Sequence, residues 1–403
     1  MTCINNLKIY PTDYPAEIAS SNLPGDPIIG VEDVLDAVTA LQVQSRDTAL
    51  RMANNRRILG YQTIQNQNRL TGAVNQPLSF AEVGKRSIPK AGILGTVAYL
   101  AGGRAYGSPL ADMMAFYFGN ESAVKVGMVL SEIRLYIGTA MTDWAGYYAG
   151  GLGQNLYACL DKLSFDKPAI ARIGVDLSVA RFGASGICNY AQGVFLGGTD
   201  SSWTAVRTGD KLDFSTDIMA PLGNKLAGNR HSAHNGTSNR TDGYLFGGTS
   251  NWSTMTEYAS QLRTVEGYNY GTQNCTVLGG ALSWAHISHA SFGSPTVGYV
   301  AGGMANTNVG TASFAVTDGI SRLAYDGLVL SAMGITLAEQ TVCVDGSQSS
   351  AAGYTLGGED AQFSRMAVSN KFIFSTEAIY SLGTTLPGVY ADRGMVSDYT
   401  PGR

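Results

Sequence analysis

The sequence predicts an all-β fold, a closed six-bladed ring of sheets of the β-propeller type, preceded by an N-terminal extended arm and one amphipathic helix. The main observation is a strand-like motif ending in a glycine doublet, which occurs six times at intervals of 47 to 55 residues. Tyr stands three residues before the doublet in five copies. One such motif in every fifty or so residues is typical of radial β arrays. The copies span residues 98–103, 146–151, 193–198, 243–248, 298–303 and 353–358.

Composition agrees with this fold and excludes several function classes. The 403 residues include 50 Gly and 21 Tyr, and only 14% are charged, which suits short strands joined by tight turns. A net charge of −4 argues against a nucleic-acid surface. No apolar stretch reaches the ~18 residues of a membrane-spanning helix. The five cysteines are scattered and odd in number, which favours reduced thiols over disulfides: Cys3, Cys159, Cys188, Cys275 and Cys343.

The N-terminal region is expected to be an attachment module in three parts. Residues 1–30 contain four prolines and isolated apolar side chains, as in an extended arm that lies on another surface, or alternatively a disordered terminus. Residues 31–57 predict an amphipathic helix with acidic residues at its start and basic ones at its end. Residues 58–85 are rich in Gln and Asn and form a linker. No secretory signal precedes the arm, which implies synthesis in the cytoplasm.

The stripe of the predicted helix is narrow and needs a partner. No second strong helix follows it in the sequence, so we favour another protein chain over the propeller as that partner. The charged flanks argue against insertion into a membrane. The stripe consists of Val31, Val34, Leu35, Val38 and Leu41.

Residues 86–403 supply four short strands per period, the content of one propeller blade. The glycine doublets are expected to adopt positive φ and to allow close approach of neighbouring blades, so that Gly247→Val or Gly302→Val would unfold the array. A strand follows each doublet; in the fourth period we place it at residues 260–265. The doublets are Gly102 and Gly103, Gly150 and Gly151, Gly197 and Gly198, Gly247 and Gly248, Gly302 and Gly303, and Gly357 and Gly358.

A second repeated position lies sixteen residues before each doublet. Its side chain is expected to cap a carbonyl group in the adjacent blade. The residues there are Arg86, Arg134, Arg181, His231, His286 and Thr341.

The ring has two ways to close. Residues 386–397 resemble the first strand of a blade, and we favour their completing the blade that contains Tyr99. Alternatively, residues 86–95 supply that strand and the C-terminal segment lies outside the ring.

The order of a basic residue, a strand, a Tyr-containing strand ending in Gly-Gly and a third strand resembles the kelch repeat. His231-Ser-Ala-His234 followed by residues 243–248 is the closest copy. Most blades lack the tryptophan that kelch repeats carry near the fourth strand, and residues 214–217 and 374–377 read Phe-Ser-Thr-Asp/Glu in place of Tyr-Asp-Pro. This variant looks more like the kelch-like propellers of bacteriophage tail and virion proteins than like cellular kelch adaptors.

The sequence offers weak candidates for chemistry. All four histidines form two His-x-x-His pairs in adjacent blades, which suggests a metal site. However, residues i and i+3 of a strand point to opposite faces, so we expect no metal or other cofactor. Hydrolase and phosphate-binding motifs are missing, and no Cys–Tyr spacing indicates the copper oxidase chemistry of some kelch-like proteins. The histidines are His231, His234, His286 and His289.

Four aromatic residues lie just outside the repeated strands and are candidates for a ligand or partner surface. Alternatively, they seal the edges of the blades. They are Tyr106, Trp203, Trp252 and Trp284.

The resemblance implies a non-enzymatic bacteriophage virion structural protein, made in the host cytoplasm: a tail fibre, tail accessory or capsid-decorating protein. Its partners would be other virion proteins, further copies of itself and a glycan or protein of the host surface, without nucleic-acid binding or membrane insertion. The alternative is a kelch-like protein-binding adaptor, and a weaker one is a glycan-active or copper-dependent propeller enzyme. Fold alone does not decide among them.

Overall fold

The computed structural model describes residues 9–10, 29–30, 95–105, 108–231, 235–251, 261–305 and 315–400. The chain divides into two compact units, Met1–Ile93 and Leu94–Arg403. In the first unit, strand β1 (Ile9–Tyr10) pairs in parallel with β2 (Ile29–Gly30), within the segment predicted as an extended arm. The predicted helix at 31–57 and the linker at 58–85 lie outside the described residues.

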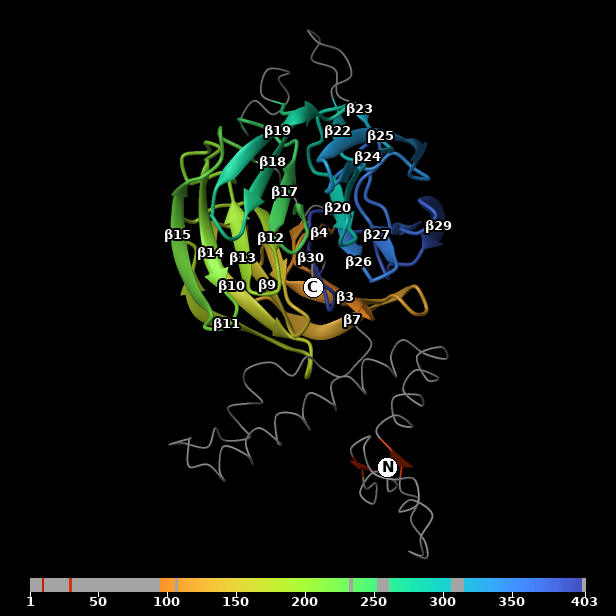
Figure 1. Cartoon of the computed structure of the whole chain (residues 1–403), viewed down its shortest axis with the longest axis horizontal. Coiled ribbons are helices and arrows are strands. Elements are labelled where there is room, and N and C mark those ends of the chain that lie inside the picture. Colours follow the sequence, from red (N-terminus) through yellow and green to blue (C-terminus); the bar gives the residue numbers. More distant parts are fainter. Residues whose placement is uncertain are drawn as a thin grey trace, which may run out of the picture. The chain divides into compact units, whose positions relative to one another are not determined.

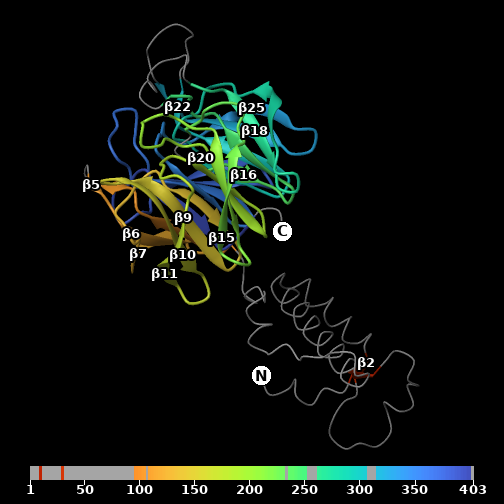
Figure 2. The same ribbon diagram turned by 90° about the vertical axis from the view of Figure 1, so that its left-hand side faces the viewer.

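The second unit is a six-bladed β-propeller, which confirms the predicted fold class (Figure 1). Each blade is a four-stranded antiparallel sheet, and the first strands of neighbouring blades lie beside one another around the axis. At the periphery, β7 (Ser122–Val129) lies next to β11 (Ala169–Asp176) of the neighbouring blade (Figure 2).

The strands of the first three blades, from the axis outward, are as follows. Blade 1 consists of β30 (Gly394–Ser397), β3 (Val97–Ala101), β6 (Asp112–Tyr117) and β7 (Ser122–Val129). Blade 2 consists of β8 (Gly138–Met141), β9 (Ala145–Leu152), β10 (Leu156–Ser164) and β11 (Ala169–Asp176). Blade 3 consists of β12 (Ser185–Cys188), β13 (Gln192–Leu196), β14 (Thr208–Asp213) and β15 (Ile218–Asn224).

The other three blades follow the same order. Blade 4 consists of β16 (Thr237–Ser238), β17 (Asp242–Phe246), β18 (Thr264–Asn269) and β19 (Cys275–Ala281). Blade 5 consists of β20 (Ala290–Gly293), β21 (Val297–Ala301), β24 (Gly319–Ala324) and β25 (Val329–Thr336). Blade 6 consists of β26 (Asp345–Gln348), β27 (Ala352–Leu356), β28 (Val368–Ile373) and β29 (Ala378–Thr384). Short hairpins β4–β5 (Arg104–Ala105, Ser108–Pro109) and β22–β23 (Met304–Ala305, Ala315–Val316) follow two of the second strands.

One strand was misplaced by the sequence reading. The third strand of blade 4 is β18 at Thr264–Asn269, four residues after the predicted start. The reason is a longer connection in this blade, where the chain pairs Thr249 with Gln261 before the strand begins. The buried side chains of Val265 and Tyr268 then set the register of the strand.

The glycine doublets join each blade to the next. Every glycine of the six doublets has positive φ, and the second one donates its N–H to a carbonyl oxygen of the following blade at 2.6–2.9 Å. At the first glycine a Cβ would overlap that same oxygen; at Gly302 it would lie 2.7 Å from the Thr341 carbonyl. Glycine is therefore required twice over, for conformation and for space. The accepting residues, in ring order, are Arg134, Arg181, Arg230, His286, Thr341 and Tyr390.

These six accepting residues define what we call the entry position of each blade, and they correct the repeat read from the sequence. In blade 4 the entry position is Arg230 and not His231, because one additional residue separates it from the doublet. In blade 1 it is Tyr390, supplied by the C-terminal part of the chain, whereas Arg86 lies outside the described residues.

The side chains at the entry positions of blades 2 to 6 cap carbonyl groups, but in their own blade and not in the adjacent one as we expected. Arg134 Nη1 donates to the carbonyl of Gly150 at 2.5 Å, and His286 Nδ1 donates to that of Gly302 at 2.8 Å. The main-chain carbonyl of the same residue makes the link to the preceding blade. In blades 2 to 5 the side chain points into its own blade, where a polar partner lies on the third strand.

That partner changes from blade to blade together with the entry residue. In blades 2 to 4 it is a carboxylate in a buried ion pair: Arg134–Asp161 at 2.6 Å, Arg181–Asp210 at 3.3 Å and Arg230–Glu266 at 2.9 Å. In blade 5 the neutral His286 faces the hydroxyl of Ser321. In blade 1 both positions are apolar, with Tyr390 and Met114 in one buried cluster. Matched polarity avoids an unpaired buried charge in each case.

The Tyr before the doublet packs between blades. Tyr147 stacks on Phe214 of the next blade at 5.0 Å, and its hydroxyl donates to Asp217 there at 2.8 Å. Tyr299 repeats this arrangement, stacking on Phe374 and donating to Glu377. The junctions of blades 2 and 3 and of blades 5 and 6 are thus each held by an aromatic pair whose polar end is satisfied.

The C-terminal strand closes the ring, as we favoured: β30 pairs with β3, and the two strands meet beside the C-terminus in Figure 1. We call this junction the seam. Asp398 accepts hydrogen bonds from the main-chain N–H groups of Thr96 and Val97 at 2.8 and 3.1 Å, and from the Thr96 hydroxyl at 2.6 Å. Residues at the corresponding turn of the other five blades accept two such N–H groups within one continuous segment: Thr142, Asn189, Asn239, Ser294 and Ser349. Asp398 therefore forms the equivalent of this turn between two segments that lie at opposite ends of the propeller sequence.

Candidate functional site

The propeller has two distinct ends. The turns between first and second strands lie at one end, which we call the turn face, and the chain enters the propeller there at Gly95, beside Asp398. The glycine doublets and the connections from second to third strands lie at the other end, which we call the loop face. Loops on such a rigid scaffold are common positions for binding residues.

Two blades carry the same exposed aromatic turn on the loop face. In blade 3, Trp203 has φ of 59° and a relative exposure of 50%. In blade 6, Phe363 has φ of 57° and a relative exposure of 54%. Trp203 was among the predicted candidates, whereas Phe363 was missed. The signal was present in the sequence, because each ring stands six residues after the first glycine of its doublet.

From Trp203 a run of aromatic rings leads inward. Trp203 packs edge-on against the buried Phe182 at 5.7 Å, and Phe182 contacts His231 at 5.1 Å. The His231 ring also lies 6.3 Å from Tyr136, and its Nδ1 lies 3.0 Å from the Thr199 hydroxyl. His231 is thus part of the packing beneath the loop face.

At the axis the loop face carries a charged cluster. Arg104 Nε donates to Asp392 at 2.5 Å, and its Nη2 donates to Glu359 at 3.1 Å, while Arg365 lies 3.4 Å from Glu359. Burial raises the pKa of both Asp392 and Glu359, and the nearby Arg104 opposes this rise. Arg104 precedes the third strand of blade 1 and Asp392 precedes β30, so this cluster also ties the seam together.

Beneath the cluster, main-chain groups of five blades meet around the axis. Main-chain hydrogen bonds run from blade to blade, from Gly183 to Tyr136, on to Asp392, Cys343 and Ser288, at 2.8–3.3 Å. All five residues have positive φ. Buried apolar side chains fill the space inside, including Ile287, Val342 and Ala391.

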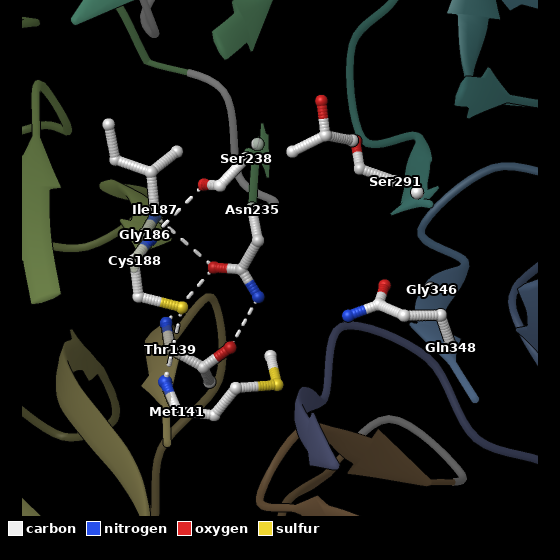
Figure 3. A pocket seen from close by; sticks show the side chains of 13 residues that line it. Thr139, Met141, Gly186, Ile187, Cys188, Asn235, Ser238, Ser291, Gly346 and Gln348 are labelled. Atoms are coloured by element: carbon white, nitrogen blue, oxygen red, sulfur yellow. Dashed lines mark hydrogen bonds between the residues drawn. The ribbon is translucent and has the colours of Figure 1, made fainter. Parts of the chain in front are cut away.

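A narrow hollow lies between the first strands and is lined by residues of five blades (Figure 3). Asn235 stands in it: its Oδ1 accepts the N–H groups of Thr139 and Gly186 at 3.0 and 3.2 Å, and its Nδ2 donates to the Thr139 hydroxyl. The amide nitrogen of Gln348 points into the same space (Figure 3). Among the described residues, the lining contains amides, hydroxyls and two sulfur atoms, and no carboxylate or imidazole. Such a lining can bind water or small neutral groups but offers no acid–base pair.

The remaining predicted residues are placed as follows. Trp284 is half-buried; it packs against Gly319 and lies edge-on to His286 at 6.3 Å. His286 and His289 are buried, with ring centroids 6.0 Å apart. Tyr106, Trp252 and His234 lie outside the described residues.

Within the residues that the structure describes, no group of three or more His, Cys, Asp or Glu side chains could hold a metal ion. None of the described residues belongs to a helix long and apolar enough to cross a membrane. Cys159, Cys188, Cys275 and Cys343 are free thiols, and burial raises the pKa of Cys188 to about 11. A high pKa makes a thiol a poor nucleophile at neutral pH.

Comparisons with known proteins add no family. A scan against models of known protein families matched none of them, and a search of curated proteins found no match.

Proposed function

We propose that the chain is a non-enzymatic structural protein of a bacteriophage virion, a tail fibre, tail accessory or capsid-decorating protein. Its N-terminal region would anchor it to other virion proteins or to copies of itself, and its propeller would be displayed toward the host surface. The resemblance of residues 86–403 to kelch-like virion propellers suggests this role.

The observation that carries the proposal is the polarity of the propeller. The N-terminal region is joined to the turn face at Gly95, whereas the exposed rings of Trp203 and Phe363 stand on the loop face. The exposed rings thus stand at the end of the propeller opposite to the point where the chain enters it, as a displayed binding surface would require. The carboxylates of the axial cluster are engaged by Arg104, which supports a binding role over catalysis.

The first test is the oligomeric state of the full-length protein, measured by light scattering after size-exclusion chromatography. We expect a defined oligomer that Leu35→Asp combined with Leu41→Asp dissociates, because both residues belong to the predicted apolar stripe. Ala40→Asp, on the opposite side of the predicted helix, is the matched control and should leave the oligomer intact. A monomeric wild-type protein would contradict the proposal and favour the kelch-like adaptor.

The second test addresses the virion itself. Mass spectrometry of purified particles from cultures that produce the protein should detect the chain in a fixed ratio to the other structural proteins. Its absence from the particles, with the protein present in the soluble lysate, would refute the assignment.

A further inference from the structure

We infer that Trp203 and Phe363 are two saccharide-stacking platforms on the loop face, one on blade 3 and one on blade 6. The inference rests on the proposed display function and names the chemical class of its ligand. Two observations support it. Both blades contain the same turn, and each turn carries an exposed aromatic ring that its conformation does not require.

The two turns have the same construction. In blade 3, Trp203 N–H donates to the carbonyl of Asp200 at 3.0 Å, and the Asp200 carboxylate accepts the Ser202 N–H at 3.0 Å. In blade 6, Phe363 N–H donates to the carbonyl of Asp360, and the Asp360 carboxylate accepts the Gln362 N–H, both at 2.9 Å. The aspartate side chain fixes each loop, so each ring is held at a defined position.

Neither local conformation nor burial explains an aromatic residue there. Both residues have positive φ, where glycine is favoured and a bulky side chain costs roughly 1 kcal/mol. Both expose about half of their surface to water. Trp203 has one edge-on ring contact, with Phe182, and Phe363 has no ring contact among the described residues. Strained and exposed side chains are characteristic of functional sites.

The chemistry around the rings favours a saccharide over a protein partner. Blades 3 and 6 are three steps apart in a ring of six, so the two rings lie on opposite sides of the axis and do not merge into one apolar patch. A protein interface usually buries a contiguous area of about 800 Å² on each side. Each ring is instead flanked by small polar groups that can bind sugar hydroxyls: Ser202 and Thr204 in blade 3, Gln362 and Ser364 in blade 6.

Two separated platforms also suit a repeating polysaccharide. Each platform alone would bind a sugar ring weakly, through stacking and a few hydrogen bonds. Engagement of both by one polymer raises the overall affinity without further contacts.

The test is binding of the full-length protein to a glycan array that includes bacterial surface polysaccharides, followed by calorimetric titration with the oligosaccharide that binds best. We expect Trp203→Ala and Phe363→Ala each to weaken binding roughly tenfold, which corresponds to about 1.4 kcal/mol. Tyr380→Ala is the matched control, because Tyr380 is 53% exposed on the outer strand β29, and it should leave binding unchanged.

Folding is separated from binding by a second pair of variants, Trp203→Gly and Phe363→Gly. Glycine suits the positive φ of both positions, so these variants should keep the wild-type melting temperature while losing the ring and the affinity. An array without any bound saccharide, or a titration that the double variant leaves unchanged, would overturn the inference. The oligomerisation test of the proposed function is unaffected by either result, so the two failures are distinguishable.

Discussion

Replacement of Asp398 tests how the ring is held shut. In Asp398→Ala the N–H groups of Thr96 and Val97 lose their acceptor, as does the Thr96 hydroxyl. Val97 is buried, so water does not replace the lost bond there. An unsatisfied buried donor costs about 1–3 kcal/mol, and a hydrogen bond to a charged group contributes about 1.5–3 kcal/mol. Burial raises the pKa of the Asp398 carboxyl, because a charged carboxylate is costly to bury, and this cost offsets part of the gain. We therefore expect Asp398→Ala to lower the free energy of unfolding by about 3 kcal/mol.

The other blades provide the controls. Asn occupies this turn position in blades 3 and 4, so Asp398→Asn should keep both main-chain bonds and change the unfolding free energy by less than about 1 kcal/mol. Ser349→Ala removes the same two bonds from a turn that remains covalently continuous, so it should cost only about 1 kcal/mol.

The measurement is urea unfolding followed by circular dichroism, with hydrogen exchange of β3 and β30 as a local readout. Faster exchange confined to these two strands in Asp398→Ala would locate the loss at the seam. The reasoning fails if Asp398→Ala costs no more than Ser349→Ala, or if Asp398→Asn is as damaging as Asp398→Ala.

Three further predictions concern the glycine doublets and the entry positions, and all can be checked by the same unfolding assay. Gly302→Val should lower the free energy of unfolding by more than about 4 kcal/mol, because it combines positive φ with overlap on a neighbouring carbonyl oxygen. Gly127 has open space around it, so Gly127→Val should cost less than about 1 kcal/mol. Equal losses in the two variants would refute the junction geometry. Burial lowers the pKa of His286 to about 4, whereas the same side chain has a pKa near 6.5 in the unfolded state. The unfolded state therefore binds more protons between these two values. As the pH falls from about 6.5 to 4, the free energy of unfolding should decrease by up to ~3 kcal/mol. His286→Gln should remove that part of the pH dependence, and an unchanged difference between pH 7 and pH 4.5 would contradict it. Arg134→Met should cost about 3–5 kcal/mol by leaving the Asp161 charge buried and unpaired, and adding Asp161→Leu should restore most of it; a double variant as unstable as the single one would refute the pairing.

The sequence predicted those parts of the fold that depend on local, repeated chemistry. A glycine doublet is required wherever the main chain of one blade approaches that of the next, so the number of blades could be predicted by counting the doublets. Closure by the C-terminal segment could be favoured because residues 386–397 carry the pattern of a first strand. Ion pairs between different segments could not be predicted in this way. Arg134 and Asp161, for example, come together only when the strands of the sheet have paired.

Errors arose where loop lengths vary. One additional residue in blade 4 shifted the entry position from Arg230 to His231, and two histidine pairs then looked equivalent when they are not. Phe363 was not among the predicted aromatic residues, although the preceding Asp360 marks the same turn as Asp200. The spacing from the doublet, not the residue type, carries that information.

The seam also sets the order of events during synthesis. Strand β3 is made early, but its partner β30 follows about 300 residues later, which takes the ribosome roughly 15–60 s at 5–20 residues per second. For that time the nascent chain is an open arc whose inner edge at β3 has no partner of its own. Pairing with a neighbouring nascent chain then competes with closure, so the yield of closed rings should fall when translation of the last blade is slowed or when polysomes are crowded.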